Sequence, residues 1–251
     1  MLKILLSGVS GAMGHMLQEL ITKDPECLIV AGFDINTEQG TSFPIYSDLS
    51  RCTEKADVII DFSHFKAFDS IFNYAKTTKT PIVIATTGLS DDNIQSIQNA
   101  SADFPVFKTA NMSLGINIIA KALKEMASAF EDSFDIEIIE KHHNKKADAP
   151  SGTALLLADA VNDGLSQKKE YTYGRDGREC KRQASELGIH AIRGGTIPGE
   201  HTVLFAGNDE LIEIKHTALS KKVFASGAIK AAKYLAGKDP GLYDMQDLIN
   251  D

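Results

Sequence analysis

The sequence predicts an α/β protein, with a doubly wound parallel sheet in its N-terminal part and a second part of α+β type with an open mixed sheet. Two observations support this prediction. The first 110 residues alternate short apolar runs with segments of helical periodicity, and strands that are apolar throughout are typical of parallel sheets covered on both faces. After Asn111 the strand candidates follow one another without full crossover helices, which indicates an antiparallel or mixed sheet.

The first part has the alternation of strands and helices that is typical of a Rossmann-type domain. Its expected strands are residues 4–6, 28–33, 58–62, 81–85 and 105–107. Residues 13–21 place apolar side chains at helical spacing between the first two strands. This order predicts a sheet with helices on both faces.

The second part begins with an amphipathic helix, expected over residues 114–130. Residues 134–138 alternate strictly between apolar and polar side chains, as a strand with one solvated face does. Further strand candidates are residues 189–197, 202–205 and 211–216, and a final helix with several small residues is expected over 224–235. The stretch 167–183 is charged and glycine-containing, and its pattern is the least structured.

A chain of 251 residues allows one large domain or two small ones. We place the change of domain near residue 113 and the return near residue 218. Residues 1–113 and 218–251 then form one domain, and residues 114–217 form the other. The pattern shows no internal repeat or low-complexity linker between them.

Composition and charge exclude several classes of function. The net charge of -8 argues against nucleic acid as a partner, since phosphate binding needs a basic face. The three cysteines, Cys27, Cys52 and Cys180, are far apart and form no CxxC pair, so we expect free thiols and neither a disulfide framework nor a metal site. The first apolar run is too short for a signal peptide or a membrane span. We therefore expect a cytoplasmic protein without a membrane partner.

A glycine-rich turn follows the first strand and opens the first helix. The segment from Gly8 through Gly11 to Gly14 has the spacing G-x-x-G-x-x-G, which also suits an ordinary tight turn. Asp34 lies 20 residues after Gly14 at the end of the second strand, where a carboxylate can accept hydrogen bonds from a ribose. Together they predict a dinucleotide site with the pyrophosphate at the helix N-terminus.

The expected cofactor is NADH rather than NADPH. No lysine or arginine occurs between Asp34 and Arg51 to receive a 2′-phosphate. Further contacts are expected where other strands end, because an open α/β sheet binds its ligand at that edge. The candidate cofactor contacts are Gly8, Val9, Ser10, Gly11, Ala12, Met13, Asp34, Phe62, Ser63, Ala85, Thr86, Thr87, Gly88, Thr109, Ala110, Asn111 and Met112.

The densest group of polar residues spans positions 140–154. Pro150, Ser151 and Thr153 are typical of a helix start, so the N–H groups of Gly152 and Thr153 are expected to point toward an anion. Two histidines and three lysines precede them in an acidic protein. This arrangement suits a small substrate that carries carboxylates.

Other interpretations of this segment remain open at the level of the residues. Neighbouring histidines on an extended backbone point to opposite faces and no third ligand is evident, which disfavours a metal. Ser151 lacks the G-x-S-x-G turn of many hydrolases. A plain solvated basic loop is the third alternative.

The segment His142-His143-Asn144-Lys145-Lys146-Ala147-Asp148-Ala149-Pro150-Ser151-Gly152-Thr153-Ala154 closely resembles the signature of the 4-hydroxy-tetrahydrodipicolinate reductase family, also called dihydrodipicolinate reductase. The resemblance extends over nearly the whole chain, including positions 8–14, 86–88, 110–113, 199–202 and 224–228. It implies reduction of a cyclic imine dicarboxylate by NADH or NADPH, followed by protonation, in lysine and diaminopimelate synthesis.

The resemblance also implies residue roles. His142 and Lys146 correspond to the family's catalytic acid and proton-donor pair, and histidine suits general acid work near neutral pH. The implied substrate contacts are His143, Ser151, Gly152, Thr153 and Arg193. Residues 114–217 would bind substrate and form a homotetramer, and the other domain would bind the dinucleotide.

Three positions depart from the family pattern. Ala85 stands in place of a usual glycine, Phe65 in place of a proline, and Asn144 in place of a commonly basic residue. None of these removes a proposed proton donor. Two alternative functions stay open: another Rossmann reductase of a small acid, and a dinucleotide-sensing or scaffold protein without turnover.

Overall fold

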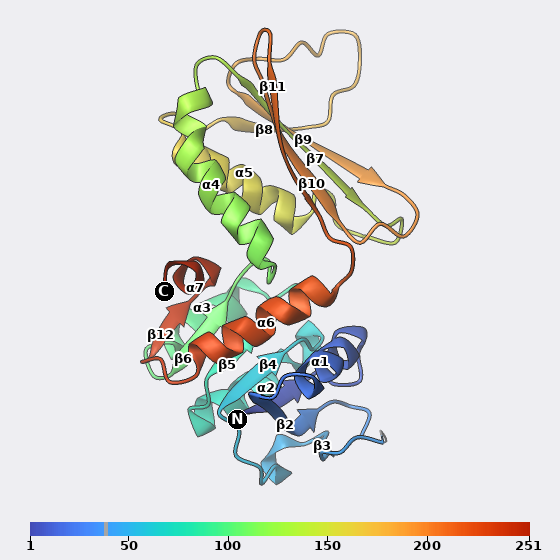
Figure 1. Cartoon of the computed structure of the whole chain (residues 1–251), viewed down its shortest axis with the longest axis vertical. Helices are drawn as coiled ribbons and strands as arrows, with labels where there is room; N and C mark the ends of the chain where they lie inside the picture. Colours follow the sequence, from blue (N-terminus) through green and yellow to red (C-terminus); the bar gives the residue numbers. More distant parts are fainter. Residues whose placement is uncertain (38–39) are drawn as a thin grey trace. The chain divides into compact units, whose positions relative to one another are not determined.

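The computed structural model describes residues 1–37 and 40–251 and divides into two compact units. One unit comprises Met1–Ser113 and Lys222–Asp251, and the other comprises Leu114–Lys221 (Figure 1). The expected return to the first unit at residue 218 differs from this division by four residues. Ala218 still donates its N–H to the carbonyl of Gly199, 2.9 Å away in the second unit, which keeps this segment with the second sheet.

The first unit contains a parallel sheet of seven strands in the order β12-β6-β5-β4-β1-β2-β3. The strands are β1 (Leu2–Ser7), β2 (Cys27–Phe33), β3 (Ile45–Tyr46), β4 (Val58–Asp61), β5 (Ile82–Ile84), β6 (Pro105–Lys108) and β12 (Gly241–Tyr243). The order 3-2-1-4-5-6 confirms the doubly wound Rossmann-type arrangement. Its topological switch point lies between β1 and β4, whose paired last residues are Ser7 and Asp61.

Helices cover both faces of this sheet. One face packs against α1 (Ala12–Thr22), α6 (Lys222–Leu235) and α7 (Met245–Asn250). The other face packs against α2 (Phe68–Thr78) and α3 (Asp91–Ala100). Two short 3₁₀ helices, η1 (Leu49–Arg51) and η2 (Phe65–Ala67), lie in the loops. Alternate residues of each central strand enter opposite cores: Ile4 and Leu6 enter one, and Leu5 enters the other.

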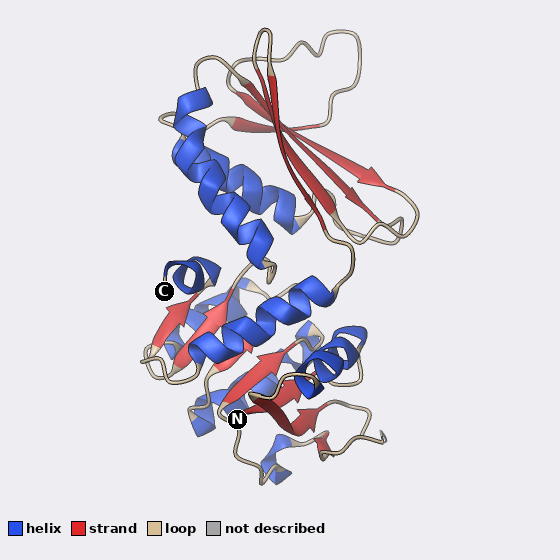
Figure 2. Cartoon of the chain, viewed as in Figure 1, coloured by secondary structure: helices blue, strands red, loops and turns tan. Residues whose placement is uncertain are grey.

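The second unit is a mixed five-stranded sheet with two helices on one face (Figure 2). Its helices are α4 (Leu114–Phe130) and α5 (Gly152–Gly164). Its strands, in the spatial order β11-β10-β7-β9-β8, are β7 (Asp135–His142), β8 (Glu170–Tyr173), β9 (Glu186–Arg193), β10 (Glu200–Ala206) and β11 (Leu211–Thr217). β7 runs antiparallel to β10 and parallel to β9, which confirms a mixed sheet.

Two expectations for this unit need correction. The strand expected over 189–197 runs instead from Glu186 to Arg193, because Gly195 and Thr196 form a turn in which Gly195 has a φ of 49°. The stretch 167–183 forms no helix or strand over most of its length, as its pattern predicts, but it contains the unexpected short strand β8. This strand pairs with β9 through its backbone, so the polar side chains of the stretch do not prevent it. No helix in the described part of the chain is long and apolar enough to cross a membrane.

The helix-facing side of β7 changes from apolar to polar along its length. Ile136 and Ile138 belong to the core with α4 and α5, whereas Glu140 and His142 follow on the same face and are also buried. The alternation of the strand thus places two titratable side chains at the edge of an apolar core.

Candidate functional site

The glycine turn of the first unit is closed by backbone contacts that exclude side chains. Gly8 has a φ of 78°, and a Cβ atom there would lie 2.6 Å from the carbonyl oxygen of Phe62. A Cβ atom at Gly14 would lie 2.3 Å from the carbonyl oxygen of Gly8. Gly11 is the N-cap of α1 and makes no side-chain capping bond. The turn therefore brings its backbone to the N-terminus of α1 at the carboxyl end of β1.

Asp34 follows β2 directly and contacts this turn. Its Oδ2 accepts a hydrogen bond of 2.9 Å from the N–H of Ser10, and its Oδ1 accepts one of 3.2 Å from the N–H of Asn36. Ser10 also donates its hydroxyl to the carbonyl of Asn36 at 3.2 Å. The structure thus brings the glycine turn and the carboxylate together at the ends of adjacent parallel strands.

Asp61 ties two further loops together and was not among the expected site residues. Its carboxylate is fully buried at the end of β4. Oδ2 accepts a 2.6 Å hydrogen bond from the hydroxyl of Thr86, and Oδ1 accepts one of 3.1 Å from the N–H of Ser63. The loops that follow β4 and β5 are therefore fixed to one buried group.

The other expected cofactor contacts differ in how much of them faces solvent. The side chains of Val9 and Met112 are buried in the core with α1 and α6. Asn111 is buried as well, and its Oδ1 accepts a 2.7 Å hydrogen bond from the N–H of Ser113. The exposed members are Gly11, Ala12, Thr87, Gly88 and Ala110, and the half-buried ones are Gly8, Ser10, Met13, Asp34, Phe62, Ser63, Ala85 and Thr109. Val9 and Met112 offer a ligand mainly backbone atoms.

The second unit contains a network around Glu140, which sequence reasoning missed. Glu140 is fully buried. Its Oε2 lies 2.6 Å from Nδ1 of His142, and its Oε1 accepts a 2.9 Å hydrogen bond from the N–H of Ser151. Arg193 donates to both oxygens at 2.7 Å. Although burial opposes ionisation, the bonds from Arg193 and His142 hold the pKa of Glu140 below its usual value.

Ser151 begins α5 as its N-cap. Its hydroxyl oxygen accepts a 3.1 Å hydrogen bond from the N–H of Ala154 and lies 2.9 Å from Nε2 of His201. Burial, and to a smaller extent the nearby His142, lower the pKa of His201 to about 4. His201 is therefore neutral at neutral pH. A Cβ atom at Gly152, the first residue of the helix, would meet no atom within 4 Å, so the helix start faces open space.

Burial also lowers the pKa of His142, while its bond to Glu140 acts in the opposite direction. Its Nδ1 is held by Glu140, so its other ring nitrogen, Nε2, is the one left for a ligand. A Cβ atom at Gly199 would lie 3.1 Å from Nε2, and the glycine keeps this space free of a side chain. The ring centroid of His201 lies 5.1 Å away.

The loop after β7 is fixed by backbone bonds. His143 donates its N–H to the carbonyl of Ile197 at 2.9 Å, and Asn144 donates to that of Gly195 at 3.2 Å. Lys146 is held by an ion pair of 2.8 Å with Asp148. The structure thus brings His142, His143, Lys146 and the start of α5 into one loop region of the second unit.

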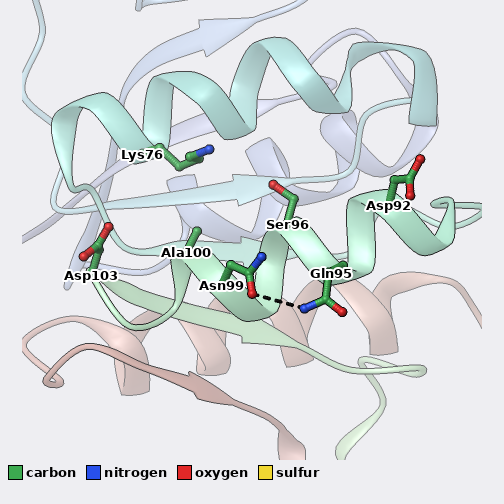
Figure 3. A pocket seen from close by; sticks show the side chains of 7 residues that line it. All are labelled: Lys76, Asp92, Gln95, Ser96, Asn99, Ala100 and Asp103. Carbon is green, nitrogen blue, oxygen red and sulfur yellow. Dashed lines mark hydrogen bonds between the residues drawn. The ribbon is translucent and has the colours of Figure 1, made fainter.

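A separate pocket lies between α2 and α3 (Figure 3). Its volume is about 420 Å³, and its lining residues are Lys76, Asp92, Gln95, Ser96, Asn99, Ala100 and Asp103. It belongs to the helical layer and includes none of the expected site residues. We assign it no role in the chemistry.

Comparison with known proteins decides the family. The family model described as dihydrodipicolinate reductase, N-terminus, matches residues 2–112, and the one described as dihydrodipicolinate reductase, C-terminus, matches residues 115–249. The chain belongs to the dihydrodipicolinate reductase family. This confirms the resemblance carried by residues 142–154.

Two relatives agree with this assignment, and a solved structure shares the fold. The chain is 51% identical to the 4-hydroxy-tetrahydrodipicolinate reductase of Caldanaerobacter subterraneus subsp. tengcongensis, covering 99% of this chain and 98% of that protein. It is 48% identical to that of Clostridium novyi at the same coverage. The dipicolinate-bound dihydrodipicolinate reductase from Paenisporosarcina sp. TG-14 shares the fold, with a TM-score of 0.80, 22% identity and 97% coverage of both chains.

Proposed function

We propose that the protein reduces 4-hydroxy-tetrahydrodipicolinate to tetrahydrodipicolinate with NADH or NADPH, in lysine and diaminopimelate synthesis. The observation that carries this proposal is the pairing of His142 with the start of α5. Both are attached to the carboxylate of Glu140, in a chain that belongs to the reductase family. The site thus combines a proton donor with a helix start that can bind an anion. This combination suits a dicarboxylate whose ring takes up a proton during its reduction.

The dinucleotide fits the first unit. The glycine turn and the N-terminus of α1 would receive the pyrophosphate, and Asp34 would accept hydrogen bonds from the adenosine ribose. When bound, the reduced dinucleotide supplies a hydride to the substrate ring and leaves oxidised, while the substrate hydroxyl leaves as water and one proton is taken up. Asp61 holds the Thr86 and Ser63 loops, which line the same sheet edge.

The dicarboxylate fits the second unit. The N–H groups of Gly152 and Thr153 at the start of α5, together with His143, would bind one or both carboxylates. Ser151 holds this helix start through its capping bond. His142, with Lys146, would deliver the proton to the reduced ring.

We propose that NADH is preferred over NADPH. Asp34 would lie close to a 2′-phosphate and repel it, and no basic residue follows before Arg51. The test is kcat/KM for both cofactors in the wild type and in Asp34→Ser. A higher value for NADH, with a ratio that falls toward one in the variant, supports the preference. Equal or higher kcat/KM with NADPH in the wild type contradicts it.

The experiment for the reaction itself couples the protein to the preceding synthase. Pyruvate and aspartate semialdehyde generate the unstable substrate in place, and the loss of NADH absorbance is followed. Rapid loss that requires both the synthase and this protein supports the reductase. No loss despite measurable NADH binding contradicts it and favours a different small-acid reductase or a sensing protein.

We also propose a cytoplasmic homotetramer, on the basis of the family alone. Its mass in solution, measured by light scattering, tests the assembly. About four times the 27.2 kDa of one chain is expected, and the mass of a monomer contradicts the proposal.

A further inference from the structure

We propose that Glu140 is the positioning residue of this site: it fixes His142 so that Nε2 exchanges the proton, and Arg193 serves Glu140 rather than the substrate. This inference rests on the proposed function for its catalytic meaning. The predicted tautomer of the His142 ring can be tested without any substrate.

Each carboxylate oxygen of Glu140 accepts two hydrogen bonds, so all four acceptor positions of the carboxylate are occupied. Oε2 accepts from His142 Nδ1 at 2.6 Å and from Arg193 at 2.7 Å. Oε1 accepts from the N–H of Ser151 at 2.9 Å and from Arg193 at 2.7 Å. An ionised carboxylate has only acceptors, so Nδ1 of His142 must carry a hydrogen. In the neutral ring Nε2 is then the free base, and in the protonated ring Nε2–H is the available donor.

The four terminal N–H donors of Arg193 are committed as well, while its buried Nε–H has no hydrogen-bond partner among the described residues. One terminal nitrogen donates to Glu140 and to the carbonyl of Ile192 at 2.8 Å. The other donates to Glu140 and to the carbonyl of Asp148 at 2.7 Å. These four bonds use all four terminal hydrogens of the guanidinium. A direct contact between these hydrogens and a substrate carboxylate would require breaking one of these four bonds, and we therefore assign Arg193 to holding Glu140 and the loop before Pro150.

One carboxylate thus anchors both parts of the site. Through His142 it orients the proton donor, and through the N–H of Ser151 it fixes the residue that caps α5. A nine-residue loop, residues 143–151, separates His142 at the end of β7 from Gly152 at the start of α5. A loop of this length does not by itself fix the distance between the two residues. The shared anchor sets their separation, which is the kind of preorganisation that general acid catalysis needs.

Charged and titratable groups surround His142 on several elements. Glu140 lies on the same strand, Lys146 in the following loop, Arg193 on β9 and His201 on β10. Of these, only Glu140 favours the protonated ring, while burial and the two cations disfavour it. Removing the carboxylate therefore has a defined direction: the pKa of His142 falls.

The test compares Glu140→Gln with Glu137→Gln. Glu137 is a matched control, because it lies on the same strand, on the opposite face, and pairs with Arg175, Arg182 and His190. Long-range ¹H–¹⁵N NMR of labelled histidines, assigned with His142→Asn, reports the tautomer and pKa of His142. In the wild type we expect hydrogen on Nδ1. In Glu140→Gln we expect a lower pKa and a mixture of tautomers, and in Glu137→Gln no change at His142.

Kinetics provide the second readout. We expect kcat to fall about 10–100-fold in Glu140→Gln, the usual scale for removing an orienting partner, with NADH affinity unchanged and kcat of Glu137→Gln close to wild type. Glu140→Asp, which keeps the charge, should recover part of the loss. For Arg193→Lys we expect kcat to fall more than KM rises, whereas a substrate-binding arginine would mainly raise KM.

Each outcome bears on the inference. A wild-type His142 with its hydrogen on Nε2, or an unchanged tautomer and pKa in Glu140→Gln, overturns it. If Glu140→Gln does not fold, the wild-type tautomer decides the question: hydrogen on Nδ1 of His142 supports the inference, and hydrogen on Nε2 overturns it. If the wild type does not reduce the substrate, the proposed function fails while the NMR result still decides the positioning role.

Discussion

The carboxylate of Glu140 lies 2.6 Å from Nδ1 of His142, two residues further along β7 on the same face of the sheet. The remaining acceptor positions of that carboxylate face Arg193 and the N–H of Ser151. This relationship fixes the orientation of the His142 ring. Substitutions that alter this contact should therefore change the protonation chemistry of His142.

Replacing the proposed proton donor should affect turnover and leave cofactor binding intact. We expect His142→Asn, and likewise Lys146→Ala, to lower kcat by about 10²–10⁴-fold, the usual contribution of a positioned acid. NADH affinity, measured by fluorescence titration, should stay at the wild-type value. His190→Asn is the control, since His190 pairs with Glu137 on the other face of the sheet. Near-normal kcat in both site variants would refute the assignment.

The pH dependence of kcat/KM should report the buried state of His142. Burial holds its pKa below 6.5 in the free protein, and kcat/KM reflects ionisations of the free enzyme. Because the protonated ring is the donor, kcat/KM is expected to fall as the pH rises through this lowered pKa. The profile should be measured under substrate-limited conditions. A falling limb centred at or above pH 6.5 would contradict this prediction.

His201 should make the protein less stable as the medium becomes mildly acidic. Its folded pKa of about 4 lies below the ordinary value of 6.5, so between these values the unfolded chain binds a proton that the folded chain does not. Stability from this group is complete above pH 6.5 and decreases as the pH falls toward 4. The full difference corresponds to about 3 kcal/mol.

Urea unfolding between pH 7 and pH 5 tests the role of His201. The variant His201→Gln should show a flatter dependence of the unfolding free energy on pH than the wild type. His15→Gln, on the exposed side of α1, should follow the wild-type dependence. Parallel curves for wild type and His201→Gln would show that this histidine does not titrate as the burial predicts.

The glycine turn should tolerate a methyl group at one glycine and not at another. In Gly14→Ala the new Cβ atom would lie 2.3 Å from the carbonyl oxygen of Gly8, so the turn must move, at a cost of about 1–3 kcal/mol. In Gly11→Ala the nearest contact is 3.4 Å, which is ordinary packing. Thermal unfolding should therefore show a clearly lower Tm for Gly14→Ala than for Gly11→Ala. Equal Tm values would contradict the close approach.

Asp61 should stabilise the loops that follow β4 and β5, through its bonds to Ser63 and Thr86. In Asp61→Asn an amide replaces the carboxylate. Its N–H can donate to the hydroxyl of Thr86, which then donates to the carbonyl of Ser63, 3.0 Å away, so both loops lose their bonds to a charged acceptor. We expect a loss of about 1–3 kcal/mol in stability and weaker NADH binding. Thr86→Val, which removes only one of these bonds, should show the smaller effect in the same calorimetric titration. Unchanged affinity in Asp61→Asn would contradict the linking role.

The sequence was sufficient for the elements that depend on local pattern. The apolar runs around Ile4 and Ile59 predict parallel strands, and Pro150, Ser151 and Thr153 predict the start of a helix, which the structure bears out. The glycine spacing and Asp34 were recognised from their separation along the chain. β8 was missed because its residues are polar and pair through their backbone.

The contacts between distant residues could not be predicted in the same way. The alternation of β7 places Glu140 and His142 on one face, yet nothing local shows that Arg193, 53 residues away, meets this carboxylate. The pairing of β7 with β9 decides it, because the register sets His142 opposite Arg193. Asp61 was overlooked for a similar reason: its partner Thr86 becomes a neighbour only when β4 and β5 pair.

The proposed hydride transfer from NADH to the substrate can be tested by following the transferred hydrogen. NADH deuterated at C4 on the transferred face is used with substrate made in place by the synthase, and the product is examined by mass spectrometry. We expect one deuterium in the product, in both wild type and the slower His142→Asn variant, because the residues of the second unit supply only the proton. A product without deuterium, formed while labelled NADH is bound, would contradict the account.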